Sequence, residues 1–397
     1  MMTIDSYGTL VAASLTLLTG RKLVASIRSL RTYSIPEPVV GGLIVALALY
    51  AAKSAFEFEV RFDSTLNTPL MLGFFASIGL NADLVSLKRG GRPLLLLLAC
   101  VVGFIIAQNT FGLILAKLLG FQPLMGLLAG SITLSGGHGT GAAWGAVFSD
   151  KYGLAGATEL AIACATFGLV LGGLIGGPVA RHLARKTKQP SDEMASDHLG
   201  IFEEPRTTRL ITAPAMIETL AMFAICLLVG SKISAALQGS SLELPVFVCV
   251  LFVGVVLRSA LAVIGGYEVF ERCVSVLGNV SLALFLAIAL MSLRLWELAS
   301  LALPMFIFLG AQALLMASWA IFITFRVMGS NHDAMVIAAG HCGFGLGATP
   351  TAIANMQAVT ERFGHSPLAF LIVPMVGAFF IDIANAIIIK LFLTILT

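Results

Sequence analysis

The chain has 397 residues, of which 58% are hydrophobic and only 11% are charged. A soluble globular protein carries roughly 25% charged residues, so this composition excludes a soluble protein and favours an all-α polytopic membrane protein. The formal net charge of +3 is small, and the positions of the charges carry more information than their sum. We expect the lipid bilayer, and no nucleic acid, as the partner of this chain.

The first half of the chain contains apolar stretches of about 20 residues, which is the length that spans a bilayer. Arg21 and Lys22 follow the first stretch instead of preceding it, which predicts an uncleaved first span and not a signal peptide. Five spans are predicted here, at residues 7–26, 39–55, 69–87, 94–119 and 157–181. A glycine-rich hairpin is predicted between the last two spans, at about residues 123–148.

The second half repeats this order after a polar linker at residues 182–210. The motif ELP introduces its second span much as IPEP introduces the second span of the first half. Its five predicted spans lie at residues 211–237, 244–263, 278–292, 298–325 and 367–395. A second hairpin is predicted at about residues 334–357, so that residues 1–181 and 211–397 form two repeats.

An odd number of spans in each repeat predicts that the two repeats have opposite orientations in the membrane. With the N-terminus outside, about 17 of the 24 Lys and Arg residues fall on cytoplasmic segments, as the positive-inside rule requires. This arrangement places both termini outside and the linker in the cytoplasm. It also makes the two hairpins enter from opposite faces, so that their tips meet near the midplane. A rival model counts each hairpin as a full span and has twelve helices.

The two hairpins are recognised by their glycines. The stretch SITLSGGHGTGAAW contains four glycines around His138 and Thr140, and GHCGFGLGATPT repeats the pattern about 203 residues later, at His341. Glycine in a helix interior costs about 1 kcal/mol relative to alanine, so we expect each stretch to break its helix. Matching Gly-interrupted apolar segments in two halves are the best pointer in a sequence to a transporter's binding site.

Such breaks suit an anionic substrate. The N–H groups at a helix start carry partial positive charge and bind anions, and glycine lets a ligand approach the backbone closely. The candidate substrate-binding residues are Ser135, Gly136, Gly137, His138, Gly139, Thr140, Gly141, His341, Gly343, Gly345, Thr349 and Thr351. Two alternatives stay open: glycines also let membrane helices pack closely, and the histidines are as consistent with structural hydrogen bonds as with a substrate or proton role.

Asp382 lies in the apolar stretch GAFFIDIANAIII of the last predicted span. A carboxylate at that depth is expensive and marks an ion or substrate site by default, although pairing with a cation or a role as a helix cap is the alternative. Carboxylate, amide and hydroxyl oxygens suit Na⁺. The candidate Na⁺ ligands are Asp382, Asn385, Asn81, Thr166 and Asn279.

The small residues of GLVLGGLIGGPVA are spaced four apart, as at Gly168 and Gly172, which predicts close helix packing within the chain. The six cysteines lie mostly in apolar runs without a CxxC pair, so we expect neither a zinc site nor a disulfide framework.

The motifs IPEPVVGGL, SITLSGGHGTGAAW, ATFGLVLGGLIGGPVA, ELPVFVCVLFVGV, AAGHCGFGLGATPTAIANM and VPMVGAFFIDIAN together resemble the bacterial sodium/glutamate symporters, the glutamate:sodium symporter family. The resemblance runs nearly end to end. It implies Na⁺-driven uptake of L-glutamate across the bacterial inner membrane, two inverted repeats of five helices with re-entrant loops at Gly136–Gly141 and Gly343–Gly347, and a homodimer. No cofactor is expected beyond Na⁺ as the coupling ion.

The mechanism expected from this resemblance is alternating access, in which Na⁺ orders the hairpin tips and glutamate binds next. Two transport alternatives remain open: a Na⁺-coupled di- or tricarboxylate symporter, and a Na⁺/H⁺ antiporter that uses Asp382. An enzyme is not expected, because HExxH, Ser–Lys and GxGD-type pairings and a nucleotide site are all missing from the sequence.

Overall fold

The computed structural model describes residues 2–28, 30, 36–56, 60–82, 86–185, 187, 210–238, 244–265, 267–292 and 302–396. Most of the predicted linker at 182–210 lies outside the described residues. The described part of the chain is almost entirely helical, as the composition predicts.

The elements of the first half follow the predicted order. Their bounds are β1 Met2–Ile4, α1 Ser6–Ser26, α3 Glu37–Phe56, β2 Val60–Phe62, α4 Asn67–Asn81, α5 Ser86–Leu118, α6 Pro123–Leu127, η1 Leu128–Ile132, α7 Gly137–Tyr152 and α8 Ala157–Ala184. The segment η1 is a π-helix, and α5 is kinked at Gly91, where φ is +57°. The strands β1 and β2 pair in parallel and fasten the start of α1 to the segment before α4.

The described part of the second half is entirely helical in its regular elements. Their bounds are α9 Ala213–Leu237, α10 Val246–Gly265, α11 Glu271–Met291, α12 Ala302–Trp319, η5 Ala320–Thr324, α13 Phe325–Val327, α14 His332–Leu346, α15 Thr349–Phe363, α16 Pro367–Met375, η6 Val376–Phe380 and α17 Ile381–Leu396. Helix α11 begins seven residues before the predicted span at 278–292. In these added residues Glu271 pairs with Arg258 of α10, and Cys273 and Val274 are buried.

Seven described helices are long and apolar enough to cross a membrane, and the bent segment from α16 to α17 adds an eighth if it is counted as one span. The seven are Glu37–Phe56, Gly91–Leu118, Ala157–Ala184, Ala213–Leu237, Val246–Val263, Glu271–Met291 and Pro304–Val327. Helices α1 and α4 are not among them, because α4 has only 15 residues and α1 mixes polar residues and the charges of Arg21 and Lys22 with its apolar ones. The structure therefore confirms a polytopic helical membrane protein, whereas five spans in each half remain a prediction.

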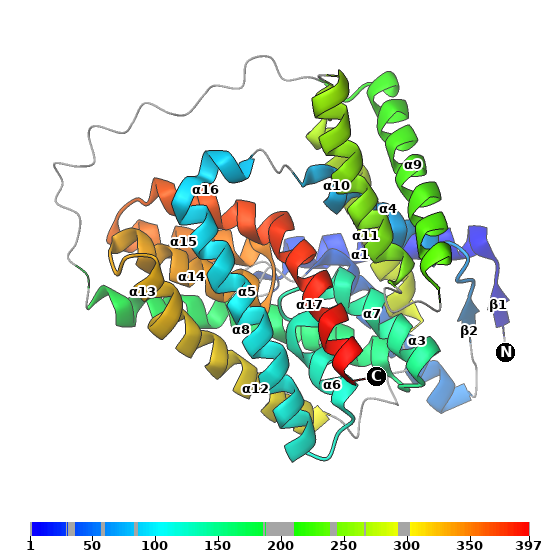
Figure 1. Cartoon of the computed structure of the whole chain (residues 1–397). Coiled ribbons are helices and arrows are strands. Elements are labelled where there is room, and N and C mark those ends of the chain that lie inside the picture. The colour runs from blue at the N-terminus through cyan, green and yellow to red at the C-terminus, as the bar shows by residue number, and fades with distance from the viewer. Residues whose placement is uncertain are drawn as a thin grey trace.

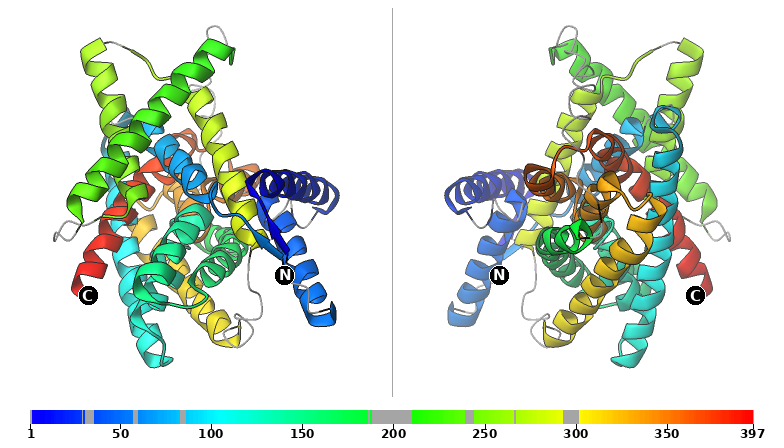
Figure 2. Two further views of the ribbon diagram at one scale, coloured as in Figure 1. Left: turned by 90° about the vertical axis from the view of Figure 1, so that its right-hand side faces the viewer. Right: turned by 90° about the vertical axis from the view of Figure 1, so that its left-hand side faces the viewer.

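The helices form two packing groups (Figures 1 and 2). In the first group, α1 packs on α3 and α9 packs on α10, while α4 contacts α10 and α11 contacts both α3 and α4. Figure 2 shows the α1–α3 pair and the α9–α10 pair on separate flanks of the molecule. In the second group, α8 packs against α7 and α14, and α5 and α12 run beside each other.

Glycines permit the closest helix contacts. A Cβ atom at Gly79 of α4 would clash with the Leu251 carbonyl oxygen of α10. A Cβ atom at Gly168 of α8 would clash with the Leu346 carbonyl oxygen of α14, and Gly172 lies against the carbonyl groups of Cys342 and Gly343. The prediction that this glycine stripe packs within the chain is confirmed for Gly168 and Gly172, whereas nothing lies within 4 Å of a Cβ atom at Gly177.

Candidate functional site

Two helix–break–helix segments meet in the centre of the second packing group. In the first, α6 continues into η1, which ends at Ile132, and α7 starts at Gly137. In the second, α14 ends at Leu346 and α15 starts at Thr349. We call residues 133–136 the first tip and residues 347–348 the second tip. An ideal Cβ atom on Gly137 would lie 3.6 Å from the Gly347 carbonyl oxygen, so the two tips are adjacent.

The breaks do not fall on every glycine of the two motifs. Gly139 and Gly141 lie inside the first turns of α7, and Gly343 and Gly345 lie inside α14. These glycines serve close packing: Gly139 contacts the Phe74 ring and Gly343 contacts the backbone of Ala352. Each glycine-rich stretch contains a break, at residues 133–136 and 347–348, but most of its glycines are helical, because tight packing against neighbouring helices stabilises helical glycine.

The first tip is held by amide side chains from two other helices. The Ser131 hydroxyl donates to Asn385 Oδ1 at 2.6 Å, and Asn385 Nδ2 donates to the Ser131 carbonyl oxygen at 3.0 Å. The Ser131 N–H donates to Asn109 Oδ1 at 3.0 Å. The Ser135 hydroxyl lies 2.7 Å from Gln108 Oε1 and 3.2 Å from the Gly345 carbonyl oxygen. All of these side chains are buried.

Sequence reasoning did not identify Gln108, Asn109, Ser131 or Gln312, although a signal was present. The dipeptide Ala-Gln occurs in both long apolar spans, at Gln108 and at Gln312, 204 residues apart. Gln312 Nε2 donates to the Gln108 carbonyl oxygen at 3.1 Å. This spacing matches the offset of about 203 residues between the two predicted hairpins.

Each motif histidine bonds a threonine of a neighbouring helix. His138 Nε2 lies 3.0 Å from Thr166 Oγ1, and the same hydroxyl lies 2.9 Å from the Ile162 carbonyl oxygen. His341 Nδ1 lies 2.9 Å from Thr324 Oγ1. The His341 ring also stacks on Phe344, and its Nε2 is buried without a partner in the described part of the chain.

The remaining hydroxyls lie close behind the tips. The Thr349 hydroxyl donates to the Gly377 carbonyl oxygen at 2.6 Å, in the π-helix before Asp382. Thr351 Oγ1 is buried and has no partner among the described residues, and Thr140 is buried in the first turn of α7.

The candidate Na⁺ ligands separate into two groups. Asn385 bonds Ser131, just before the first tip, and Thr166 bonds His138, just after it. Asp382, one helical turn before Asn385, is half-buried and has no hydrogen bond or ion pair within the described ranges.

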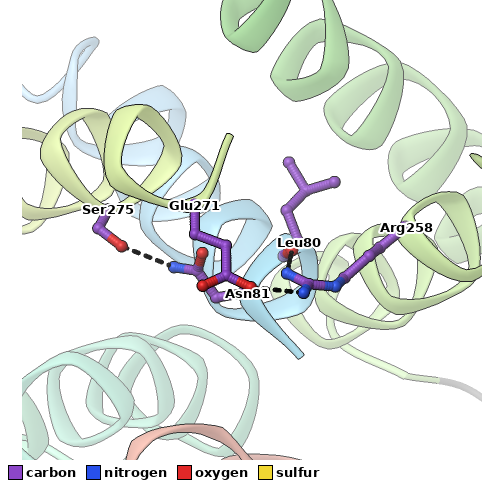
Figure 3. Close-up of polar contacts among 5 residues, drawn as sticks. All are labelled: Leu80, Asn81, Arg258, Glu271 and Ser275. Carbon is purple, nitrogen blue, oxygen red and sulfur yellow. Dashed lines mark hydrogen bonds and ion pairs between the residues drawn. The ribbon is translucent and has the colours of Figure 1, made fainter. Parts of the chain in front are cut away.

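Asn81 and Asn279 lie elsewhere. Figure 3 shows that Asn81 ends α4, where its Nδ2 donates to Ser275 of α11 at 3.1 Å beside Arg258 and Glu271. Asn279 is exposed on α11. Among the described residues no hydrogen bond joins either side chain to the tips, so the structure brings together only part of the predicted set.

Comparison with known proteins identifies the family of this chain. The family model described as "Sodium/glutamate symporter" matches residues 2–365. The chain is 62% identical to the sodium/glutamate symporters of Escherichia coli and Shigella flexneri over 394 residues, covering 99% of this chain and 98% of each of those proteins. It is 54% identical to that of Haemophilus influenzae over 391 residues, which is 98% of this chain and 97% of the relative. The chain belongs to the sodium/glutamate symporter family, whose members are transporters and not enzymes.

Proposed function

We propose that this protein couples inward Na⁺ movement to the uptake of L-glutamate by alternating access. The observation that carries the proposal is that two helix breaks meet inside a polytopic helical protein, where Gly137 lies next to the Gly347 carbonyl oxygen. Non-helical backbone at membrane depth is tolerated where it is buried in protein or lines a wet cavity. The names of the relatives supply the substrate and the coupling ion.

The contact pattern supports two inverted repeats, residues 1–181 and 211–397, joined by a cytoplasmic linker at 182–210. The α1–α3 pair corresponds to the α9–α10 pair, and α4 packs on α10 as α11 packs on α3. Each half also contains a helix–break–helix segment. The segment of α6, η1 and α7 precedes α8, and the segment of α14 and α15 precedes α16 and α17. We propose that these segments, at about residues 123–148 and 334–357, are re-entrant hairpins that enter from opposite faces.

The substrate would bind at the two tips. The starts of α7 and α15 supply N–H groups and the positive ends of two helix dipoles. Buried hydroxyl groups lie in the same segments, on Ser135, Thr140 and Thr351. The residues proposed to contact glutamate remain Ser135, Gly136, Gly137, His138, Gly139, Thr140, Gly141, His341, Gly343, Gly345, Thr349 and Thr351.

Sodium would bind beside the first tip. Asp382 supplies a carboxylate without a partner in the described ranges, and Asn385 and Thr166 supply amide and hydroxyl oxygens nearby. Na⁺ bound there would stabilise the Ser131–Asn385 contact and so order the tip before glutamate binds. The positions of Asn81 and Asn279 favour a different role for these two residues.

The charge distribution favours a bacterial inner-membrane protein with both termini in the periplasm. Arg258 at the cytoplasmic end assigned to α10 and the arginines near residue 181 follow the positive-inside rule. Exposed apolar side chains on α1 and α9, such as Leu15, Leu18 and Leu228, suit contact with lipid or with a second copy in a homodimer.

Uptake of labelled L-glutamate into proteoliposomes tests the proposal. We expect accumulation with an inward Na⁺ gradient and none with choline or K⁺ in place of Na⁺. An excess of unlabelled citrate or succinate should leave this uptake unchanged. Inhibition and transport of these acids would instead favour a di- or tricarboxylate symporter. Na⁺-driven proton movement without glutamate, read by a pH-sensitive dye, would favour an antiporter using Asp382.

A further inference from the structure

The side chain of Gln108 connects the two tips. It lies on α5 and is fully buried. Its Oε1 atom accepts a hydrogen bond from the Ser135 hydroxyl of the first tip at 2.7 Å. Its Nε2 atom donates to the carbonyl oxygen of Gly345, two residues before the second tip, at 3.3 Å. The two ends of one carboxamide therefore contact Ser135 and Gly345, which lie 210 residues apart in the sequence. The Ser135 hydroxyl also lies 3.2 Å from the Gly345 carbonyl oxygen, so the three groups form one contact between the tip segments.

Neighbouring groups fix Gln108 in this position. Gln312 of α12 donates to the Gln108 carbonyl oxygen at 3.1 Å, which holds the α5 backbone. The adjacent residue Asn109 accepts from the Ser131 N–H at 3.0 Å, so α5 contacts the segment of the first tip at two points. Asn109, Gln312 and Gln108 are all fully buried. A buried carboxamide with both ends bonded holds its partners in register, because moving either one leaves a polar atom unpaired.

We propose that Gln108 is a positioning residue that holds the two tips in one arrangement, so that a single ligand is bound by both of them at once. This inference rests on the proposed function, since it assigns the tips to substrate binding. Glutamine suits the task because its carboxamide is both a donor and an acceptor, and the Ser135 hydroxyl needs an acceptor while the Gly345 carbonyl needs a donor. A shorter or an apolar side chain cannot supply both.

Hydrogen–deuterium exchange of the full-length protein without substrate tests the link directly. In Gln108→Leu we expect amide exchange to rise at both tips, in peptides covering 133–137 and 345–349, and to stay unchanged in α9. In Ser135→Ala we expect a rise at the first tip only, because the Gln108–Gly345 bond remains. Thr110→Val is the matched control, because Thr110 is an exposed polar residue on the same helix that bonds only its own backbone.

A purely structural role of Gln108 predicts a different result. It predicts faster exchange throughout the helix bundle, or a rise at one tip alone, and either outcome overturns the proposal. If Gln108→Leu fails to fold, Gln108→Asn keeps the carboxamide but is one methylene too short to reach both partners, and the same exchange pattern is expected. Because this measurement needs no substrate, it tests the role of Gln108 even if the wild-type protein does not transport glutamate.

Transport kinetics then show whether the link serves binding. We expect Gln108→Leu to raise the KM for glutamate about five- to hundredfold, as the loss of two hydrogen bonds predicts, with the maximal rate per folded protein nearly unchanged. The double variant with Ser135→Ala should have a higher KM than Gln108→Leu alone, because Ser135 is also proposed to contact glutamate and lies 3.2 Å from the Gly345 carbonyl oxygen. A lower maximal rate with an unchanged KM contradicts a positioning role.

Discussion

At the scale of single residues, Asp382 is the most informative group of the site. It lies one turn from Asn385, which makes two hydrogen bonds with Ser131, in the η1 segment just before the first tip. A half-buried carboxylate without a partner in the described part of a membrane-spanning helix is expected to have a functional ligand. A cation bound at Asp382 would connect the ion to the tip through Asn385.

The variant Asp382→Asn tests this role. We expect the Na⁺ concentration for half-maximal glutamate uptake to rise about tenfold or more, since interactions with a charged group are worth about 1.5–3 kcal/mol. Asp150→Asn removes the same charge from an exposed position on α7 and is the control. An unchanged Na⁺ dependence in Asp382→Asn would remove Asp382 from the ion site.

Much of the site could be predicted from residue type and position, and the failures have a common cause. Ser135, Asn385 and both motif histidines stand out as polar groups in apolar stretches, and the structure brings them into one region. Gln108 stands out equally, but its role depends on contacts with segments far away in the sequence. Asn279 has the right chemistry for a Na⁺ ligand, but an isolated asparagine does not reveal which face of its helix is exposed.

At the scale of elements, the number of glycines does not determine where a helix breaks. Helix α14 continues through Gly343 and Gly345 because these residues let Ala352 and Met316 approach. The break occurs at Gly347 and Ala348, before the helix start that contains Pro350. Local propensity predicted that a break exists, whereas tertiary packing determined its position.

The contact between α8 and α14 gives a prediction at this scale. Gly168→Ala should destabilise the protein by about 1–3 kcal/mol, because the new Cβ atom would meet the Leu346 carbonyl oxygen and the Leu134 side chain. Gly177→Ala on the same helix has no atom within 4 Å of its Cβ and should be neutral or stabilising by up to about 1 kcal/mol. Thermal unfolding of the two variants in detergent compares them, and equal stabilities would show that α8 does not pack on α14 in this way.

The C-terminal end of α4 gives a second prediction. Arg258 of α10 donates to the Leu80 carbonyl oxygen at 2.8 Å and pairs with Glu271 (Figure 3). The Arg258 side chain is 14% exposed and that of Glu271 is 61% exposed. A solvent-exposed ion pair is worth about 0–1 kcal/mol, whereas a buried carbonyl oxygen left without a donor costs about 1–3 kcal/mol.

Arg258→Met should therefore destabilise the protein more than Glu271→Gln does. Unfolding temperatures of the two purified variants measure this order. The reverse order would mean that the ion pair, and not the contact with the end of α4, is the main contribution of Arg258.

At the scale of the whole molecule, coupling to Na⁺ has an electrical consequence. Glutamate carries a net charge of −1, so at least two Na⁺ must accompany it for an inside-negative potential to assist uptake. One net positive charge moving down 100 mV gains about 2.3 kcal/mol, which corresponds to about 50-fold in accumulation.

We therefore expect steady-state glutamate accumulation in proteoliposomes to rise by up to about 50-fold when a K⁺ diffusion potential of about 100 mV is imposed at a fixed Na⁺ gradient. Liposomes without protein control for leakage. Accumulation that does not respond to the potential would indicate one Na⁺ per glutamate.

Coupled symport requires that Na⁺ and glutamate move together in one transport cycle. The most direct test is uptake of radioactive Na⁺ into proteoliposomes that contain only this protein, with and without external L-glutamate. We predict that L-glutamate stimulates Na⁺ entry, and that Gln108→Leu lowers this stimulation at subsaturating glutamate. Na⁺ entry that is fast without glutamate and unchanged by its addition would contradict coupled symport.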